Sequence, residues 1–133
     1  SKTKNNIEFD IIIAGAGIAG LTAAAVFSCY DLKVLCVESN QPQKKSDGDK
    51  LDIRTTAYLL KSIDLFKKVG IWQSLKQHAE PLNVMRIGDL DRIKKEFNYV
   101  ADFSASEVGQ NYLGYNIPNW KTKYILTKKI EKH

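Results

Sequence analysis

Apolar runs near the start of the chain predict a strand, a helix and a second strand. Residues 9–14 form a short run rich in isoleucine, which is typical of a strand buried on both faces. Residues 18–30 carry small and apolar side chains and predict a helix, and residues 33–37 predict another buried strand closed by Glu38. A helix that joins two buried strands forms a βαβ unit, so we expect a parallel sheet with a right-handed crossover.

The middle of the chain is more polar and predicts a loop followed by two helices. Residues 41–50 are polar and include a proline and a glycine, which favour a loop. Residues 55–68 place apolar side chains at the spacing of an amphipathic helix, and Gly70 is well suited to end it. Residues 71–78 predict a short second helix.

Alternating apolar and polar side chains in the last third of the chain predict a hairpin. Residues 84–90 and 95–103 partly alternate, are rich in β-branched and aromatic residues, and are separated by a mostly charged segment. Residues 119–132 return to helical spacing. The whole pattern predicts an α/β fold, in which a Rossmann-like βαβ unit carries an added antiparallel hairpin.

The length of 133 residues fits one domain, within which we expect three regions. Residues 1–80 would hold the βαβ unit and the helices after it. Residues 81–118 would hold the hairpin and begin a second sheet, and residues 119–133 would form a C-terminal helix.

Composition and charge narrow the classes of partner. The formal charge is +5, but only three of the cations are arginines, which nucleic-acid readers favour, so we expect no nucleic-acid partner. The two cysteines lack metal-ligand spacing, and we expect no metal site. Residues 11–30 form an uncharged run as long as a membrane span, but its glycine cluster favours a buried strand and helix. We therefore expect a cytoplasmic protein with at most peripheral membrane association.

The turn between the first strand and the first helix has the G-x-G-x-x-G pattern of dinucleotide-binding folds. Its residues are Gly15, Ala16, Gly17, Ile18, Ala19 and Gly20. The first glycine permits a tight turn, the second lets a pyrophosphate approach the backbone, and the third lets the helix pack close to the strand. The helix N-terminus adds free N–H groups and a positive dipole end. This turn is therefore a candidate pyrophosphate site.

Two charged residues extend this candidate site. Glu38 lies 18 residues past Gly20, at the end of the second strand, where a carboxylate accepts hydrogen bonds from ribose hydroxyls and repels a 2′-phosphate. Arg54 begins the segment expected to be helical, a place that the helix dipole does not favour for a cation. Arg54 either faces an anion or is a surface residue paired with Asp52. None of these features separates FAD from NAD.

Six segments in order resemble the N-terminal part of the ubiquinone-biosynthesis aromatic hydroxylases, which are FAD-dependent monooxygenases related to p-hydroxybenzoate hydroxylase. The segments are FDIIIAGAGIAGLTAA, VLCVES, DIRTTAY, VGIWQSL, AEPLNVMRIGD and LGYNIPN. The resemblance implies that the glycine turn holds the pyrophosphate of FAD, Glu38 the adenosine ribose, and Arg54 the phosphate or ribityl side. It also implies a polar FAD contact at Lys123, where the family more often has Gln or Arg.

The resemblance also implies an activity for the whole enzyme. In the family, NAD(P)H supplies electrons to FAD, and the flavin uses oxygen to hydroxylate a prenylated phenol. We expect no catalytic side chain in this segment. The family's enzymes are longer, and two later FAD motifs are absent here, so the fold is expected to be incomplete and the chain inactive alone. We expect it to associate with itself or with the missing C-terminal half.

Two other functions remain open from the residues alone. An NAD-binding module of a dehydrogenase would share the glycines and Glu38, but it leaves the DIRTTA segment unexplained. A non-catalytic remnant or assembly partner would keep the glycine turn only because the turn helps the fold.

Overall fold

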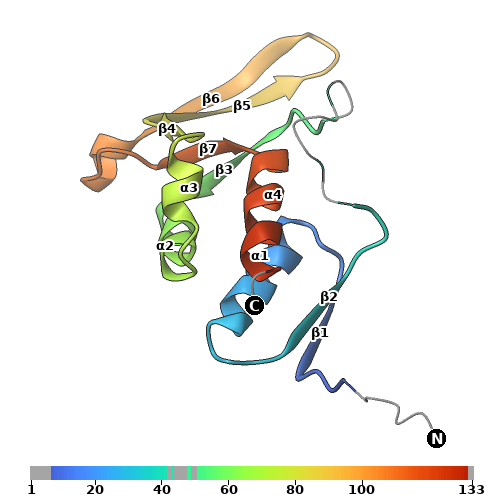
Figure 1. Cartoon of the computed structure of the whole chain (residues 1–133). Coiled ribbons are helices and arrows are strands. Elements are labelled where there is room, and N and C mark those ends of the chain that lie inside the picture. The colour runs from blue at the N-terminus through green and yellow to red at the C-terminus, as the bar shows by residue number, and fades with distance from the viewer. Residues whose placement is uncertain (1–6, 42, 44–47, 49–50, 132–133) are drawn as a thin grey trace, which may run out of the picture.

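The computed structural model describes residues 7–41, 43, 48 and 51–131. It confirms an α/β fold that contains a βαβ unit and an antiparallel hairpin (Figure 1). The elements are β1 (Ile11–Ala14), α1 (Ile18–Ser28), β2 (Val34–Val37), β3 (Thr55–Leu59), α2 (Leu60–Lys68), α3 (Trp72–Lys76), β4 (Glu80–Leu82), β5 (Val84–Asp91), β6 (Glu96–Ser104), a 3-10 turn (Ala105–Val108), β7 (Gly114–Pro118) and α4 (Asn119–Ile130). They form three small sheets, ordered β1-β2, β3-β7-β4 and β5-β6.

The βαβ unit has the predicted parallel pairing. Ile11 pairs with Val34 and the register continues to the ends of both strands. The expectation that both strands are fully buried is wrong, because Ile12 is 67% exposed and Val37 is 51% exposed. Alternate side chains of β1 differ in burial, as in a sheet covered on one face. In the described part of the chain this sheet has two strands, and its second face is open.

The core lies where four helices and the three-stranded sheet meet. Helix α4 packs against α1, α3 and β7, while α2 packs against α3, β3 and β7. Figure 1 shows α4 in red beside α1 in blue, although they are far apart in the sequence. The fully buried large side chains are Phe66, Leu21, Ile63, Ile71, Leu75, Ile117, Leu126 and Val69. Residues from both ends of the chain therefore build one core.

The segment expected to be a single helix over residues 55–68 begins as a strand. Residues Thr55–Leu59 form β3, paired antiparallel with β7, and the helix starts only at Leu60. Thr56 and Tyr58 point to the more buried side of β3, and threonine and tyrosine are residues that favour strands. Pairing with a strand far along the chain overrides the local helical spacing.

The end of α2 agrees with the sequence. Gly70 has φ 76°, a conformation that glycine adopts without strain. Its N–H donates to the carbonyl of Lys67, and the N–H of Ile71 donates to the carbonyl of Phe66. These two bonds satisfy carbonyls that the helix end would leave free. The next helix, α3, is shorter than the expected 71–78.

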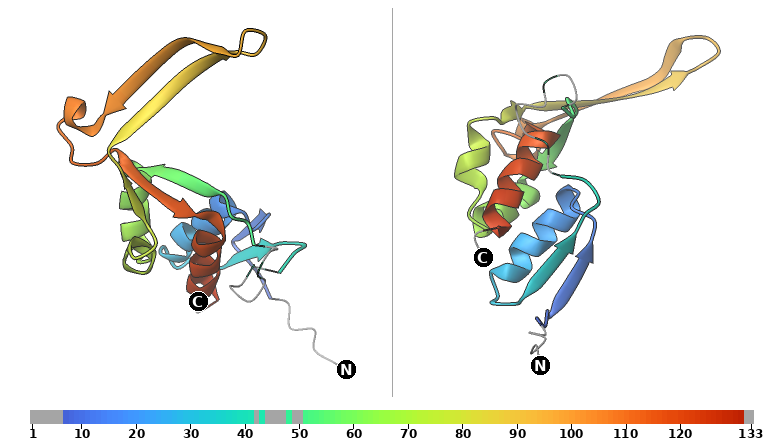
Figure 2. Two further views of the ribbon diagram at one scale, coloured as in Figure 1. Left: turned by 90° about the horizontal axis from the view of Figure 1, so that it is seen from above. Right: turned by 45° about the vertical axis from the view of Figure 1, so that its right-hand side comes forward.

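The hairpin is confirmed, with a first strand one residue longer than expected and a second strand shifted by one residue. Strands β5 and β6 pair from Val84 with Ser104 to Asp91 with Glu96, with an irregularity after Asp89. Figure 2 shows the hairpin projecting away from the helices. It leaves apolar side chains exposed along its length.

The loop expected over residues 41–50 lies mostly outside the described residues. The division at residues 80 and 118 stays a prediction, and β7, before the second boundary, pairs with β3 from before the first. Within the part of the chain that the structure describes, no helix is long and apolar enough to cross a bilayer.

Replacing Leu126 by Ala tests the packing of α4 in the core. Leu126 is fully buried, so the change should lower the free energy of unfolding by about 2–5 kcal/mol. Urea denaturation measures the loss. The matched control on the same helix is Lys128→Ala, which removes an exposed ion pair with Glu131 and should cost less than about 1 kcal/mol. Equal losses in the two variants would contradict the described packing of α4.

Candidate functional site

The glycine turn has the geometry that its pattern predicts. Gly15 has φ 100°, which lets the chain turn sharply out of β1. A Cβ on Gly20 would lie 2.0 Å from the carbonyl oxygen of Gly15, so only glycine fits at this crossing. A Cβ on Gly17 would meet nothing within 4 Å. Gly17 therefore borders open space at the N-terminus of α1, where it is the N-cap and has no side-chain cap.

Glu38 is fixed to the turn by backbone N–H groups. The N–H of Ala16 donates to its Oε2 at 2.8 Å, and the N–H groups of Ser39 and Asn40 donate to its Oε1 at 2.7 and 3.2 Å. These hydrogen bonds, that from Ala16 first, lower the pKa of Glu38 to about 2, from an ordinary 4.5. The carboxylate is thus ionised at neutral pH and held beside the glycine turn.

An open cavity of about 790 Å³ lies beside the turn and collects four of the predicted site residues, Ala16, Glu38, Arg54 and Lys123. Helix α4 contributes one face to it, since Lys123, Thr127 and Ile130 recur at helical spacing. The other lining residues are Leu21, Cys36, Ser39, Asn40, Gln41, Gln43, Asp52 and Glu131. The cavity therefore joins residues from the βαβ unit, the start of β3 and α4.

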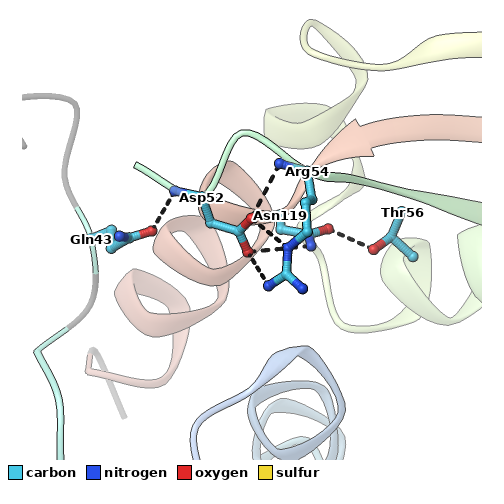
Figure 3. Close-up of polar contacts among 5 residues, drawn as sticks. All are labelled: Gln43, Asp52, Arg54, Thr56 and Asn119. Carbon is cyan, nitrogen blue, oxygen red and sulfur yellow. Dashed lines mark hydrogen bonds and ion pairs between the residues drawn. The ribbon is translucent and has the colours of Figure 1, made fainter. Parts of the chain in front are cut away.

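Arg54 is paired with Asp52, as one of the two interpretations of the sequence expected. Its Nε donates to Oδ1 at 2.8 Å and its Nη2 to Oδ2 at 2.9 Å (Figure 3). The guanidinium lowers the pKa of Asp52 well below its usual range. Arg54 is nevertheless 79% exposed and lines the cavity, so this pairing does not remove it from the site.

Asn119 is a residue of this network to which sequence reasoning gave no role. Its Nδ2 donates to Asp52 at 3.5 Å, its Oδ1 accepts from the hydroxyl of Thr56 at 2.5 Å, and its backbone N–H donates to the carbonyl of Arg54 at 2.9 Å. Figure 3 shows it between Asp52 and Thr56. The only signal in the sequence is its place at the end of the LGYNIPN segment.

Two predicted residues face a different surface. Ile18 and Ala19 line an apolar groove of about 470 Å³ between α1 and α2, which also includes Tyr58 and Phe66. Only their backbone N–H groups, in the first turn of α1, are placed to serve an anion. The side chain of Ile18 is partly buried and packs against the hydrophobic core, whereas Ala19 is exposed.

A comparison with known protein families shows to which family the chain belongs. A family model described as an FAD binding domain matches residues 8–133, nearly the whole chain. The chain belongs to the FAD binding domain family. FAD is therefore confirmed as the cofactor of the family, in preference to NAD.

The curated relatives of this FAD binding domain include a monooxygenase of ubiquinone biosynthesis and a demethoxyubiquinol hydroxylase. The chain is 30% identical over 137 aligned positions to ubiquinone biosynthesis monooxygenase COQ6, mitochondrial, of Dictyostelium discoideum, covering 94% of this chain and 27% of that protein. It is 25% identical to 3-demethoxyubiquinol 3-hydroxylase of Escherichia coli strain K12, covering 93% of this chain and 30% of that protein. The resemblance found in the sequence is confirmed. The chain spans less than a third of the length of these relatives.

Solved structures share the fold of this FAD binding domain. The flavin-dependent monooxygenase PieE, in complex with FAD and substrate, superposes with a TM-score of 0.66 at 19% identity, covering 96% of this chain and 22% of that one. Aklavinone-11 hydroxylase, in a ternary complex with FAD and aklavinone, gives a TM-score of 0.63 at 19% identity, covering 97% of this chain and 25% of that one. These likenesses confirm the fold class.

Replacing two glycines of the turn by alanine tests which of them is required for packing and which borders open space. Gly20→Ala should lower the free energy of unfolding by about 1–3 kcal/mol or more, because its Cβ would clash with the carbonyl of Gly15. Gly17→Ala adds a methyl group in open space and should cost less than about 1 kcal/mol. Chemical denaturation of both variants measures the difference. A Gly17 variant that is the less stable of the two would contradict the geometry of the turn.

The low pKa of Glu38 predicts how acid affects stability. Since the folded-state pKa is depressed, Glu38 stabilises the fold above about pH 4.5, and this contribution is lost as the pH falls toward 2. Glu38→Gln should therefore be less stable than the unsubstituted chain at pH 6, and the gap should narrow as the pH is lowered. Denaturation midpoints across this range test it. Glu80→Gln, at an exposed position on β4, is the control, and the same pH-dependent gap there would count against a specific role of Glu38.

Proposed function

We propose that this chain is the FAD-binding portion of a flavin-dependent monooxygenase that hydroxylates an aromatic ring in ubiquinone biosynthesis. The observation that carries the proposal is the cavity that brings Ala16, Glu38, Arg54 and Lys123 together beside the glycine turn. Membership of the FAD binding domain family and similarity to two proteins of ubiquinone biosynthesis support it.

In this proposal the turn from Gly15 to Gly20 holds the pyrophosphate of FAD. The open space at Gly17 lets an anion come close to the backbone. The first N–H groups of α1, including those of Ile18 and Ala19, have no partner within the helix and point toward its N-terminus. The N–H of Ala16 is not one of these anion-binding groups, because it already donates a hydrogen bond to Glu38.

Glu38 is proposed to bind the adenosine ribose. Its Oε2 accepts a hydrogen bond from the N–H of Ala16, and a carboxylate oxygen can accept two, so a lone pair remains for a ribose hydroxyl. Its negative charge at neutral pH disfavours a 2′-phosphate at the same place. The carboxylate is already oriented by three backbone N–H groups, which reduces the cost of ordering it when ligand binds.

Arg54 and Lys123 are proposed as the cationic side of the site. Arg54 has five N–H donors, and its bidentate pair with Asp52 leaves others for a phosphate or ribityl oxygen. Asp52 and Asn119 act as positioning residues, since they hold the guanidinium and the backbone of Arg54. Lys123 lines the same cavity from α4.

Bound FAD would supply the oxygen chemistry of hydroxylation, with NAD(P)H as the electron donor. The residues of this chain bind and orient the cofactor, and we assign none of them as catalytic. The proposed substrate of the whole enzyme is a prenylated phenol. The location in the cytoplasm, and a partner that is either a second copy or a chain completing the enzyme, remain predictions.

Arg54→Gln tests the proposed cationic contact. FAD should raise the melting temperature of the chain, and this variant should weaken FAD affinity about tenfold, because a hydrogen bond to a charged group is lost. Arg86→Gln is a matched control, since Arg86 is also exposed and makes a bidentate pair with an aspartate, Asp102 on the hairpin. Equal weakening in both variants would show that Arg54 has no specific contact with FAD.

The chain alone should not turn over substrate. When the chain is incubated with FAD, NAD(P)H and a prenylated phenol, we expect mass spectrometry to find no hydroxylated product. The reason is that the described residues of the proposed site bind the cofactor, and we assign none of them to binding the phenol. The full-length hydroxylase of Escherichia coli is the positive control. Product from this chain alone would refute the expected inactivity, and a preference for NAD over FAD in a titration would refute the proposed cofactor site.

A further inference from the structure

The backbone of Asp52 is bound by a side chain from the segment that follows β2. The N–H of Asp52 donates to Oε1 of Gln43 at 2.9 Å, and Figure 3 shows this bond at one end of the network that includes Arg54. Asp52 lies before the first residue of β3, so its N–H takes no part in the pairing of β3 with β7. A partly buried N–H without a partner is costly, and the amide of Gln43 supplies the partner here.

Asp52 is the more fixed member of its pair with Arg54. The side chain of Asp52 is 15% exposed, whereas that of Arg54 is 79% exposed. The carboxylate accepts hydrogen bonds from the backbone N–H and the guanidinium of Arg54, and from Nδ2 of Asn119. An exposed arginine has many rotamers, and a carboxylate in a fixed place selects among them. The direction of the guanidinium therefore depends on where the backbone of Asp52 lies.

The bond between Gln43 and Asp52 connects two stretches of chain that line the candidate cavity. Gln43 and the three residues after Glu38 line it from the segment that follows β2. Asp52 and Arg54 line it from the start of β3. The hydrogen bond of Gln43 therefore links the segment next to the proposed ribose contact to the cationic side of the site.

The place of this bond favours a role in the site over a role in the stability of the fold. Gln43, Asp52 and Arg54 all lie outside the hydrophobic core, and all three line the cavity. Loss of the bond should therefore leave the core intact and change the geometry of the cavity near Arg54.

We propose that Gln43 is a positioning residue for Arg54. Gln43 fixes the backbone of Asp52, Asp52 orients the guanidinium, and the guanidinium contacts a phosphate or ribityl oxygen of FAD. The last of these steps rests on the proposed function, whereas the first two concern the ligand-free chain. Gln43 itself needs no contact with the cofactor.

Gln43→Met tests the proposal, because methionine keeps the length of the side chain and removes the strong acceptor. In the full chain without ligand, hydrogen exchange at the Asp52 N–H and at Nε of Arg54, measured by NMR, should become about fivefold faster. FAD affinity, measured by calorimetry, should fall roughly threefold to tenfold. In the Arg54→Gln background the same substitution should change FAD affinity by less than about twofold, because the residue that Gln43 positions is gone.

The matched control is Gln77→Met. The side chain of Gln77 also bonds a backbone group, the carbonyl of Ser74, but Gln77 lies at the end of α3 and does not line the cavity. This variant should leave the exchange rates at Asp52 and Arg54 and the affinity for FAD unchanged. Circular dichroism shows whether each variant is folded.

The outcomes separate this proposal from the proposed function. Unchanged exchange at Asp52 or at Nε of Arg54 in Gln43→Met would overturn the positioning role, whether or not FAD binds. An equal loss of FAD affinity with and without the arginine, or a loss no larger than in Gln77→Met, would also overturn it and would leave the FAD site in place. If the unsubstituted chain binds no FAD, the proposed function fails, and the two exchange rates still decide whether Gln43 positions Arg54.

Discussion

The antiparallel pairing of β3 with β7 connects the parts of the site that lie farthest apart in the sequence. Strand β7 runs directly into α4, so pairing Thr55 with Pro118 sets the start of α4 beside Arg54. The N–H of Asn119 then donates to the carbonyl of Arg54 and closes the junction. Because α4 also packs on α1, the same pairing places its polar face over the cavity next to the glycine turn. Without it, the βαβ unit would keep its turn but lose the cationic side of the cavity.

The charges of the site are held in place before any ligand arrives. Glu38 is oriented by backbone N–H groups, and Asp52 orients Arg54 through two hydrogen bonds. Both carboxylates have lowered pKa values, so both are ionised over the physiological range. A site arranged in this way spends little free energy on ordering its polar groups when it binds a dinucleotide. In the proposed binding mode, repulsion between these two carboxylates and the phosphates of FAD would keep the phosphates near the N-terminus of α1 and near Arg54.

Two of the exposed apolar surfaces in the described part of the chain differ in their chemistry. On the outer face of β1 and β2, Ile12 and Val37 are exposed with little charge around them. At the end of the hairpin, apolar side chains are mixed with clustered charges of both signs. The first surface suits further protein, since a two-stranded sheet is rarely stable alone. The curated relatives are more than three times as long as this chain.

The sequence by itself determined the features whose causes lie within a short stretch of chain. The parallel βαβ unit, the tight turn at Gly15, the position of Glu38 beside it and the β5–β6 hairpin each follow from local periodicity, glycine sterics or turn composition. The tertiary structure alone decided that residues 55–59 form a strand, that β4 and β7 exist, and that Asn119 supports Arg54. It also decided that Ile12 is exposed. These features depend on which segments pair across distant parts of the chain and on whether a second layer covers a sheet, and neither has a signature in the local pattern of side chains.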